Sequence, residues 1–164
     1  MSTLIVYDSI FGNTEKIARA VARAMAPGDE VMLRRVGEAN PIEWTALDLL
    51  IVGSPTQGGR PTQAIQDFLH KIPANALENV AVTAFDTRFS AQEQGMGLRF
   101  LMRILGYAAE RIAHSLQGKG GHLATPPAGF IVEGKEGPLE EDELERAANW
   151  GSAICRATNN LQYA

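Results

Sequence analysis

Short continuous runs of hydrophobic residues alternate along the chain with segments in which hydrophobic residues recur every three or four positions. The continuous runs are rich in aliphatic and β-branched residues, which is typical of strands buried on both faces of a parallel sheet. Five strands are therefore predicted, at residues 3–7, 31–36, 49–53, 79–85 and 129–132.

The segments between these runs predict helices. After the first strand, Ile17, Val21 and Met25 recur at helical spacing, charged residues fill the other positions, and Pro27 with Gly28 ends the helix. The later segments predict a short helical turn at 41–47, a helix bounded by Pro61 and Pro73, a long helix at 97–115 that contains Gly106, and a last helix lined by Leu144, Ala147, Ala148, Gly151 and Ile154.

Strand and helix alternate without a repeat or a linker, so a single domain is predicted over residues 1–164. This alternation is typical of an α/β fold, an open parallel sheet with helices on both faces. Five strands favour the order 2-1-3-4-5. In such a sheet, ligands bind beyond the carboxyl ends of the strands, where the strand order reverses between strands one and three.

Composition narrows the functional classes. Hydrophobic residues make up 45% of the 164 residues, enough for a substantial core. The net charge is −4 and the basic residues are scattered, so nucleic acid is not an expected partner. No run approaches the roughly 18 apolar residues of a membrane span, and the first residues lack signal-peptide features, so we expect a cytoplasmic protein without stable membrane insertion. Three separated histidines and a single cysteine indicate no metal site.

The loop after the first predicted strand carries the candidate chemistry. Ser9, Ile10, Phe11, Gly12, Asn13 and Thr14 lead directly into a helix. The free N–H groups and the dipole of a helix N-terminus favour an anion. Ser9 and Thr14 add hydroxyl donors, Asn13 adds an amide donor, and Gly12 lets the backbone approach a ligand closely. We predict a phosphate site here; the alternative is a polar turn with Thr14 near a helix cap.

The sequence does not match the motifs of other phosphate-binding or phosphate-accepting domains. The loop has no lysine, which the Gly-x4-Gly-Lys-Ser/Thr motif requires, and no Gly-x-Gly-x-x-Gly follows the first strand. A receiver domain would end its third strand with an aspartate, where this chain has Gly53 and Ser54. Neutral donors around a phosphate favour a permanently bound mononucleotide.

The chain resembles the flavodoxins in their N-terminal signature, which it carries as Ile5-Val6-Tyr7-x-Ser9-x-x-Gly12-x-Thr14-x3-Ala18-x2-Val21. The order of the predicted elements extends this resemblance over the whole chain. The resemblance implies an FMN cofactor with its phosphate on Ser9 to Thr14.

The resemblance also implies two loops around the flavin ring. One follows the third strand and supplies Pro55, Thr56, Gln57, Gly58 and Gly59; the other follows the fourth strand and supplies Asp86, Thr87, Arg88 and Phe89. In flavodoxins the corresponding loops lie on the two faces of the ring.

Some positions depart from the flavodoxin pattern. Gln57 stands where many flavodoxins have a tryptophan, whereas Phe89 aligns with the tyrosine that commonly covers the outer ring face. Arg60 and Arg88 replace acidic residues. Because a nearby cation attracts the anionic reduced flavin, the hypothesis is that these arginines make the flavin less reducing than in typical flavodoxins. The alternative is that either arginine points into solvent.

The resemblance implies an electron carrier that exchanges electrons with redox partner proteins through FMN. No residue is identified as a general base or nucleophile, so no catalytic residue is predicted. One alternative is an FMN enzyme of the same fold, such as an NAD(P)H- or quinone-using reductase or a protoporphyrinogen-oxidase-type enzyme. Another is a binding module that has lost flavin, against which the intact phosphate loop counts.

Overall fold

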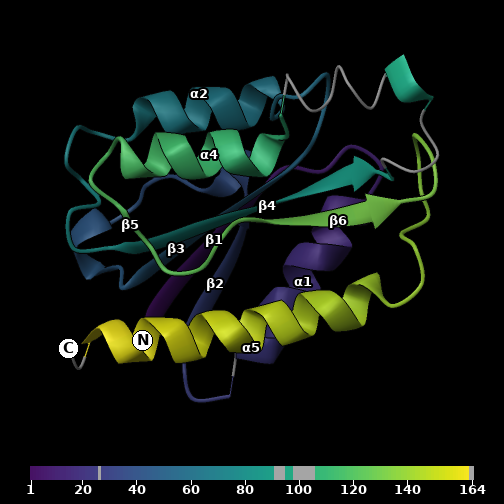
Figure 1. The fold of residues 1–164 in the computed structure, drawn as a ribbon. Helices are drawn as coiled ribbons and strands as arrows, with labels where there is room; N and C mark the ends of the chain where they lie inside the picture. The colour runs from purple at the N-terminus through teal and green to yellow at the C-terminus, as the bar shows by residue number, and fades with distance from the viewer. Residues whose placement is uncertain (26, 91–94, 98–105, 163–164) are drawn as a thin grey trace.

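The fold is seen in a computed structural model that describes residues 1–25, 27–90, 95–97 and 106–162. The described residues contain one parallel sheet in the order β2-β1-β3-β4-β5, with β6 also paired to β4 (Figure 1). The strands are β1 (Ser2–Tyr7), β2 (Glu30–Arg35), β3 (Leu49–Pro55), β4 (Ala81–Phe89), β5 (His122–Leu123) and β6 (Ala128–Val132). The predicted α/β class and strand order are confirmed.

Helices cover both faces of the sheet (Figure 1). Helices α2 (Gln63–Lys71) and α4 (Ala108–Gln117) pack on one face, against side chains such as Val52 and Val82. Helices α1 (Asn13–Met25) and α5 (Glu143–Gln162) pack on the other, against side chains such as Ile51 and Phe85. Alternate residues of the central strands therefore enter two separate cores, which explains why these strands read as continuous hydrophobic runs.

Strand β4 is longer than predicted. The sequence predicts that it ends at Phe85, but Asp86, Thr87, Arg88 and Phe89 continue the strand. They do so because β6 pairs in register with this part of β4, from Phe85 opposite Ala128 to Phe89 opposite Val132. The prediction of a loop at 86–89 is therefore wrong. Polar side chains are typical of a loop, but these residues pair with β6, a segment distant in sequence.

The fifth strand position is filled by two short segments. β5 pairs with the beginning of β4 at Ala81 and Val82, and β6 pairs with its end. Between them lie Pro126 and Pro127, which have no N–H group to donate to a ladder. The sequence analysis identifies β6 and misses β5, a strand of two residues.

The predicted helix at 97–115 is not one helix. Gly106 has a positive φ of +72°, and Tyr107 is extended before α4 begins at Ala108. Met96 and Gly97 are helical, and residues 98–105 of the prediction lie outside the described residues. The helical turn predicted at 41–47 is confined to a 3₁₀ turn at Trp44–Ala46.

No helix in the described ranges has both the length and the apolar character that crossing a bilayer demands.

The close contact of β3 with the Phe85 ring depends on Gly53. A Cβ atom added to Gly53 would overlap that ring, which packs edge-on against Phe130 and Trp150. The ring is fully buried, so it has no free space into which to move.

We expect Gly53→Ala to lower the free energy of unfolding by about 1–3 kcal/mol, because the added methyl overpacks the core. Urea unfolding followed by circular dichroism measures the loss. The matched control is Gly37→Ala, since Gly37 is exposed and has no atom within 4 Å of an added Cβ. Equal unfolding midpoints for the two variants would contradict the overpacking argument.

Candidate functional site

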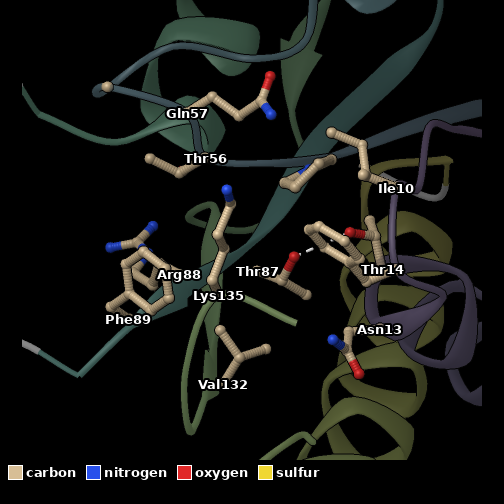
Figure 2. A pocket seen from close by; sticks show the side chains of 13 residues that line it. Ile10, Asn13, Thr14, Thr56, Gln57, Thr87, Arg88, Phe89, Val132 and Lys135 are labelled. Atoms are coloured by element: carbon tan, nitrogen blue, oxygen red, sulfur yellow. Dashed lines mark hydrogen bonds between the residues drawn. The ribbon is translucent and has the colours of Figure 1, made fainter. Parts of the chain in front are cut away.

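A cavity of about 320 Å³ opens at the carboxyl edge of the sheet (Figure 2). Its walls come from the β1–α1 loop, the β3–α2 loop, the end of β4, and the end of β6 with the loop that follows. The volume lies within the range of small-molecule sites. The lining residues are Ile10, Phe11, Asn13, Thr14, Pro55, Thr56, Gln57, Gly58, Thr87, Arg88, Phe89, Val132 and Lys135.

The β1–α1 loop is shaped around the hydroxyl of Ser9. Its Oγ accepts hydrogen bonds from the N–H groups of Gly12 at 3.1 Å and Glu15 at 3.3 Å, so its own hydrogen remains available for a ligand. Gly12 has a φ of +88°, a left-handed conformation that favours glycine. The sharp turn at Gly12 brings the chain directly into α1.

The N-terminus of α1 retains free donors. Lys16 N–H bonds to the Gly12 carbonyl and Glu15 N–H to Ser9, whereas the N–H groups of Asn13 and Thr14 have no partner in the described part of the chain. Two unpaired N–H groups, the Ser9 hydroxyl and the positive end of the helix dipole together form a site for an anion.

The side chains of Asn13 and Thr14 connect this loop to the rest of the site. Asn13 Nδ2 donates to the carbonyl oxygen of Glu136 at 2.9 Å, so the amide predicted as a ligand donor already holds the β6–α5 loop. The Thr14 and Thr87 hydroxyls are 2.8 Å apart and share a hydrogen bond (Figure 2). These contacts fix the anion loop against β4 and the β6–α5 loop.

The β3–α2 loop is a tight turn. Gln57 and Arg60 exchange backbone hydrogen bonds of 2.8 and 3.0 Å, with Gly58 and Gly59 between them at φ of +55° and +78°. Gln57 and Gly58 line the cavity, whereas Arg60 is exposed and lines a separate cleft with His70 and Arg111. Arg60 therefore lies outside the lining of the cavity, which agrees with the alternative that it does not face a flavin, and its effect on the flavin stays a prediction.

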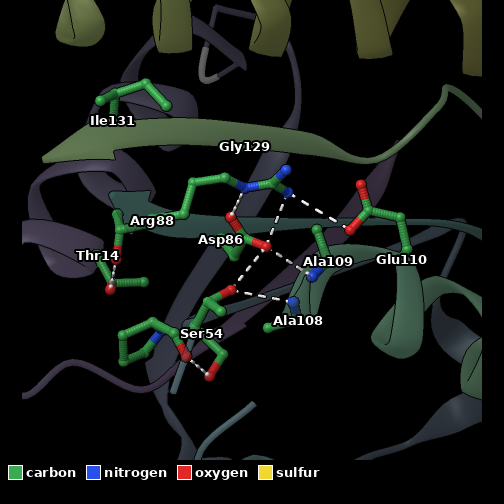
Figure 3. A network of polar contacts seen from close by, with 12 residues as sticks. Thr14, Ser54, Asp86, Arg88, Ala108, Ala109, Glu110, Gly129 and Ile131 are labelled. Atoms are coloured by element: carbon green, nitrogen blue, oxygen red, sulfur yellow. Dashed lines mark hydrogen bonds and ion pairs between the residues drawn. The ribbon is translucent and has the colours of Figure 1, made fainter. Parts of the chain in front are cut away.

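Asp86 is fully buried beneath the cavity and accepts from four donors (Figure 3). Arg88 donates through Nε at 2.6 Å and through Nη2 at 2.8 Å, the Thr56 hydroxyl donates at 3.0 Å, and the Ala109 N–H donates at 2.9 Å. Thr56 Oγ1 in turn accepts from the Ala108 N–H at 3.0 Å. Asp86 thus joins the β3–α2 loop, β4 and the first turn of α4.

Asp86 and Arg88 influence each other's pKa. Burial raises the pKa of Asp86, while the hydrogen bonds from Arg88, Ala109 and Thr56 counteract the rise. Burial also opposes the charge of Arg88, but the hydrogen bond and the attraction to Asp86 raise the pKa of Arg88. Since an ionised carboxylate only accepts hydrogen bonds, four donors around Asp86 indicate a carboxylate paired with a guanidinium.

Two further contacts hold Arg88 in place. Its guanidinium lies 3.7 Å above the Tyr107 ring and 3.5 Å from a Glu110 carboxylate oxygen. A Cβ atom on Gly129 of β6 would overlap the same guanidinium. Gly129 therefore leaves the space that the Arg88 guanidinium occupies where it pairs with Asp86.

The structure brings most of the predicted site residues to one cavity. Eleven cavity residues were predicted, and Val132 and Lys135 were missed. Of the predicted set, Ser9, Gly12, Gly59 and Asp86 do not line the cavity. The position of the fifth strand was the available signal for the missed residues, because its carboxyl end reaches the same sheet edge as the others.

We expect Asp86→Asn to lower the free energy of unfolding by about 3–5 kcal/mol, because it leaves the Arg88 guanidinium buried without its counterion. Chemical denaturation provides the measurement. Glu110→Gln is the matched control: Glu110 is exposed, and its loss should cost less than about 1 kcal/mol. Losses of similar size in the two variants would show that the buried pair has no special role.

Comparisons with known proteins agree with this fold. The family model described as flavodoxin matches residues 5–150. Oxidised flavodoxin 1 from Bacillus cereus has a TM-score of 0.71 at 18% identity, with 95% of this chain and 98% of that chain covered. A flavodoxin WrbA-like protein from Agrobacterium tumefaciens has a TM-score of 0.71 at 21% identity, with coverage of 97% and 98%.

A larger protein contains a similar part. Rubredoxin oxygen:oxidoreductase from Desulfovibrio gigas has a TM-score of 0.70 at 22% identity, and the match covers 99% of this chain but 37% of that one. Identities this low show the fold alone, whereas the family model spans most of the sequence. The chain belongs to the flavodoxin family.

Proposed function

We propose that this protein binds FMN in the cavity at the carboxyl edge of the sheet and exchanges electrons with redox partner proteins through the flavin. One observation carries the proposal: the free donors at the N-terminus of α1 open into a cavity with largely apolar walls. A mononucleotide with an anionic end and a planar ring has matching chemistry.

The phosphate end fits the donors that are present. The N–H groups of Asn13 and Thr14 and the hydroxyl of Ser9 would bind phosphate oxygens, and Gly12 lets the backbone come close. The loop from Ser9 to Thr14 holds no lysine, so neutral donors and the helix dipole would supply the attraction.

The flavin ring of FMN fits the part of the cavity that lies opposite the anion loop. Pro55, Thr56, Gln57 and Gly58 form one wall, and Thr87, Arg88 and Phe89 belong to another. Phe89 is 40% exposed and Phe11 46% exposed, so both present apolar surface that a flavin ring would cover. When bound, FMN supplies the one- and two-electron chemistry, and the protein positions the ring and sets its electrostatic surroundings.

The lining residues favour a carrier over an enzyme. Within the described chain, no carboxylate, imidazole or thiol side chain lines the cavity. These groups and lysine commonly transfer protons in enzymes, whereas an electron carrier needs none. Among the described lining residues, Lys135 is the candidate for such a role. A reductase that uses NAD(P)H, or a related oxidase, is the alternative.

The phosphate site has a direct test in Ser9→Ala. We expect this variant to bind FMN roughly 10- to 100-fold more weakly than the wild type, because it loses a hydrogen bond to a charged group. Its affinity for riboflavin, which lacks the phosphate, should change much less. Quenching of flavin fluorescence measures both constants.

Ser152→Ala is the matched control, because Ser152 lies on α5 and donates to the Ala148 carbonyl. Circular dichroism verifies that all variants fold. An equal loss of FMN and riboflavin affinity in Ser9→Ala would argue against a phosphate on this loop, and a wild type that binds no FMN would refute the proposed cofactor.

The carrier and the reductase differ in their reaction with pyridine nucleotides. For a carrier, we expect the FMN-loaded protein to show flavin absorption bands and to leave NADH and NADPH unoxidised in air or with an added quinone. Absorbance at the nicotinamide band follows the reaction, and free FMN at the same concentration is the control. Oxidation of NADH or NADPH that is much faster than with free FMN would favour the reductase over the carrier.

A further inference from the structure

Positive charge dominates the lining of the cavity. Its charged lining residues are Arg88 and Lys135, and no carboxylate belonging to the described residues lines it. Both cations lie at the part of the cavity to which the proposed function assigns the flavin ring. The two differ in whether their charge is already compensated.

The charge of Arg88 is balanced within the protein. Its guanidinium pairs with the buried Asp86 carboxylate and approaches the Glu110 carboxylate at 3.5 Å. Only 14% of the Arg88 side chain is exposed. Arg88 with its two acidic partners therefore adds no net positive charge to the cavity, contrary to the expectation from the sequence.

Lys135 has no such partner. Within the described part of the chain its ammonium group makes neither an ion pair nor a hydrogen bond, although it lines the cavity. Glu133 and Glu136 are close to it in sequence, but both are exposed and neither lines the cavity. The uncompensated charge at the cavity thus belongs to Lys135.

The loop that carries Lys135 is held firmly. Glu133 N–H bonds to the Pro138 carbonyl at 2.9 Å, and Gly137 N–H bonds to the Gly134 carbonyl at 3.2 Å. The Asn13 side chain binds the Glu136 carbonyl, one residue after Lys135. Hydrogen bonds on both sides of Lys135 therefore fix its backbone at the edge of the cavity.

The side chain of Lys135 points away from Asn13, at the start of α1. Figure 2 shows its ammonium directed toward the loop that carries Thr56 and Gln57, with Asn13 on the opposite side. The group is therefore placed to meet the ring of the proposed cofactor, while the phosphate would lie on the loop at Ser9 to Thr14.

We propose that Lys135 stabilises the negative charge that the flavin gains on reduction, an inference that rests on the proposed binding of FMN. Oxidised flavin takes up two electrons from a reductant and one proton from water, and the product ring carries one negative charge. The Lys135 ammonium attracts this charge but has little interaction with the neutral oxidised ring. The reduced cofactor consequently binds more tightly, which raises the midpoint potential by linkage.

The test compares wild type with Lys135→Met, Lys135→Arg and Lys71→Met. Lys71 is exposed at the C-terminal end of α2, near the amino ends of the strands. Its substitution therefore removes the same charge far from the cavity at their carboxyl ends. Fluorescence titration first gives the affinity of each variant for oxidised FMN. Reductive titration with dithionite and reference dyes under nitrogen then gives the midpoint potential.

We expect Lys135→Met to weaken the binding of reduced FMN by roughly tenfold or more beyond any change in its affinity for oxidised FMN, and to lower the midpoint potential accordingly. Lys135→Arg and Lys71→Met should keep the wild-type potential. High salt should narrow the difference between Lys135→Met and wild type, since ions screen exposed charges.

Two results would overturn the assignment of Lys135. One is an unchanged potential in Lys135→Met, and the other is an equal loss of affinity for oxidised and reduced FMN, which would place the lysine at the phosphate. A wild-type protein that fails to bind oxidised FMN in the first titration would instead refute the proposed function.

Discussion

The buried ion pair between Asp86 and Arg88 is the constraint on which the architecture of the site depends. Burying two charges costs several kcal/mol per ion unless their hydrogen-bonding groups are satisfied. Here Asp86 draws its donors from three elements: Arg88 on β4, Thr56 on the β3–α2 loop and Ala109 on α4. One carboxylate therefore determines how these elements meet beneath the cavity.

The same pair explains two features that look unrelated. α4 begins at Ala108, after Gly106 with its positive φ, because Thr56 and Asp86 accept the N–H groups of Ala108 and Ala109. β6 contains Gly129 opposite Asp86, because any side chain there would occupy the space of the Arg88 guanidinium. The ion pair thus sets the start of a helix and the residue allowed in a neighbouring strand.

Neutralisation of Arg88 also changes how the cavity is charged. A flavodoxin fold can serve carriers and enzymes, so the fold alone does not select a function. The lining of this cavity is more informative. Among the residues that the structure describes, it has apolar rims at Phe11 and Phe89, neutral donors at the start of α1, and Lys135 as a cation without an acidic partner. These features suit a protein that holds a flavin and adjusts its charge.

The sequence by itself determined the α/β class and predicted a candidate anion loop, while the count of five strands only favoured the strand order. These depend on local signals: continuous apolar runs, helical periodicity, and donors placed directly before a helix. Tertiary structure alone decided that β4 continues through Asp86 to Phe89 and that Lys135 joins the site. Each of these outcomes depends on pairing or turning between segments distant in sequence, which no local pattern of residues encodes.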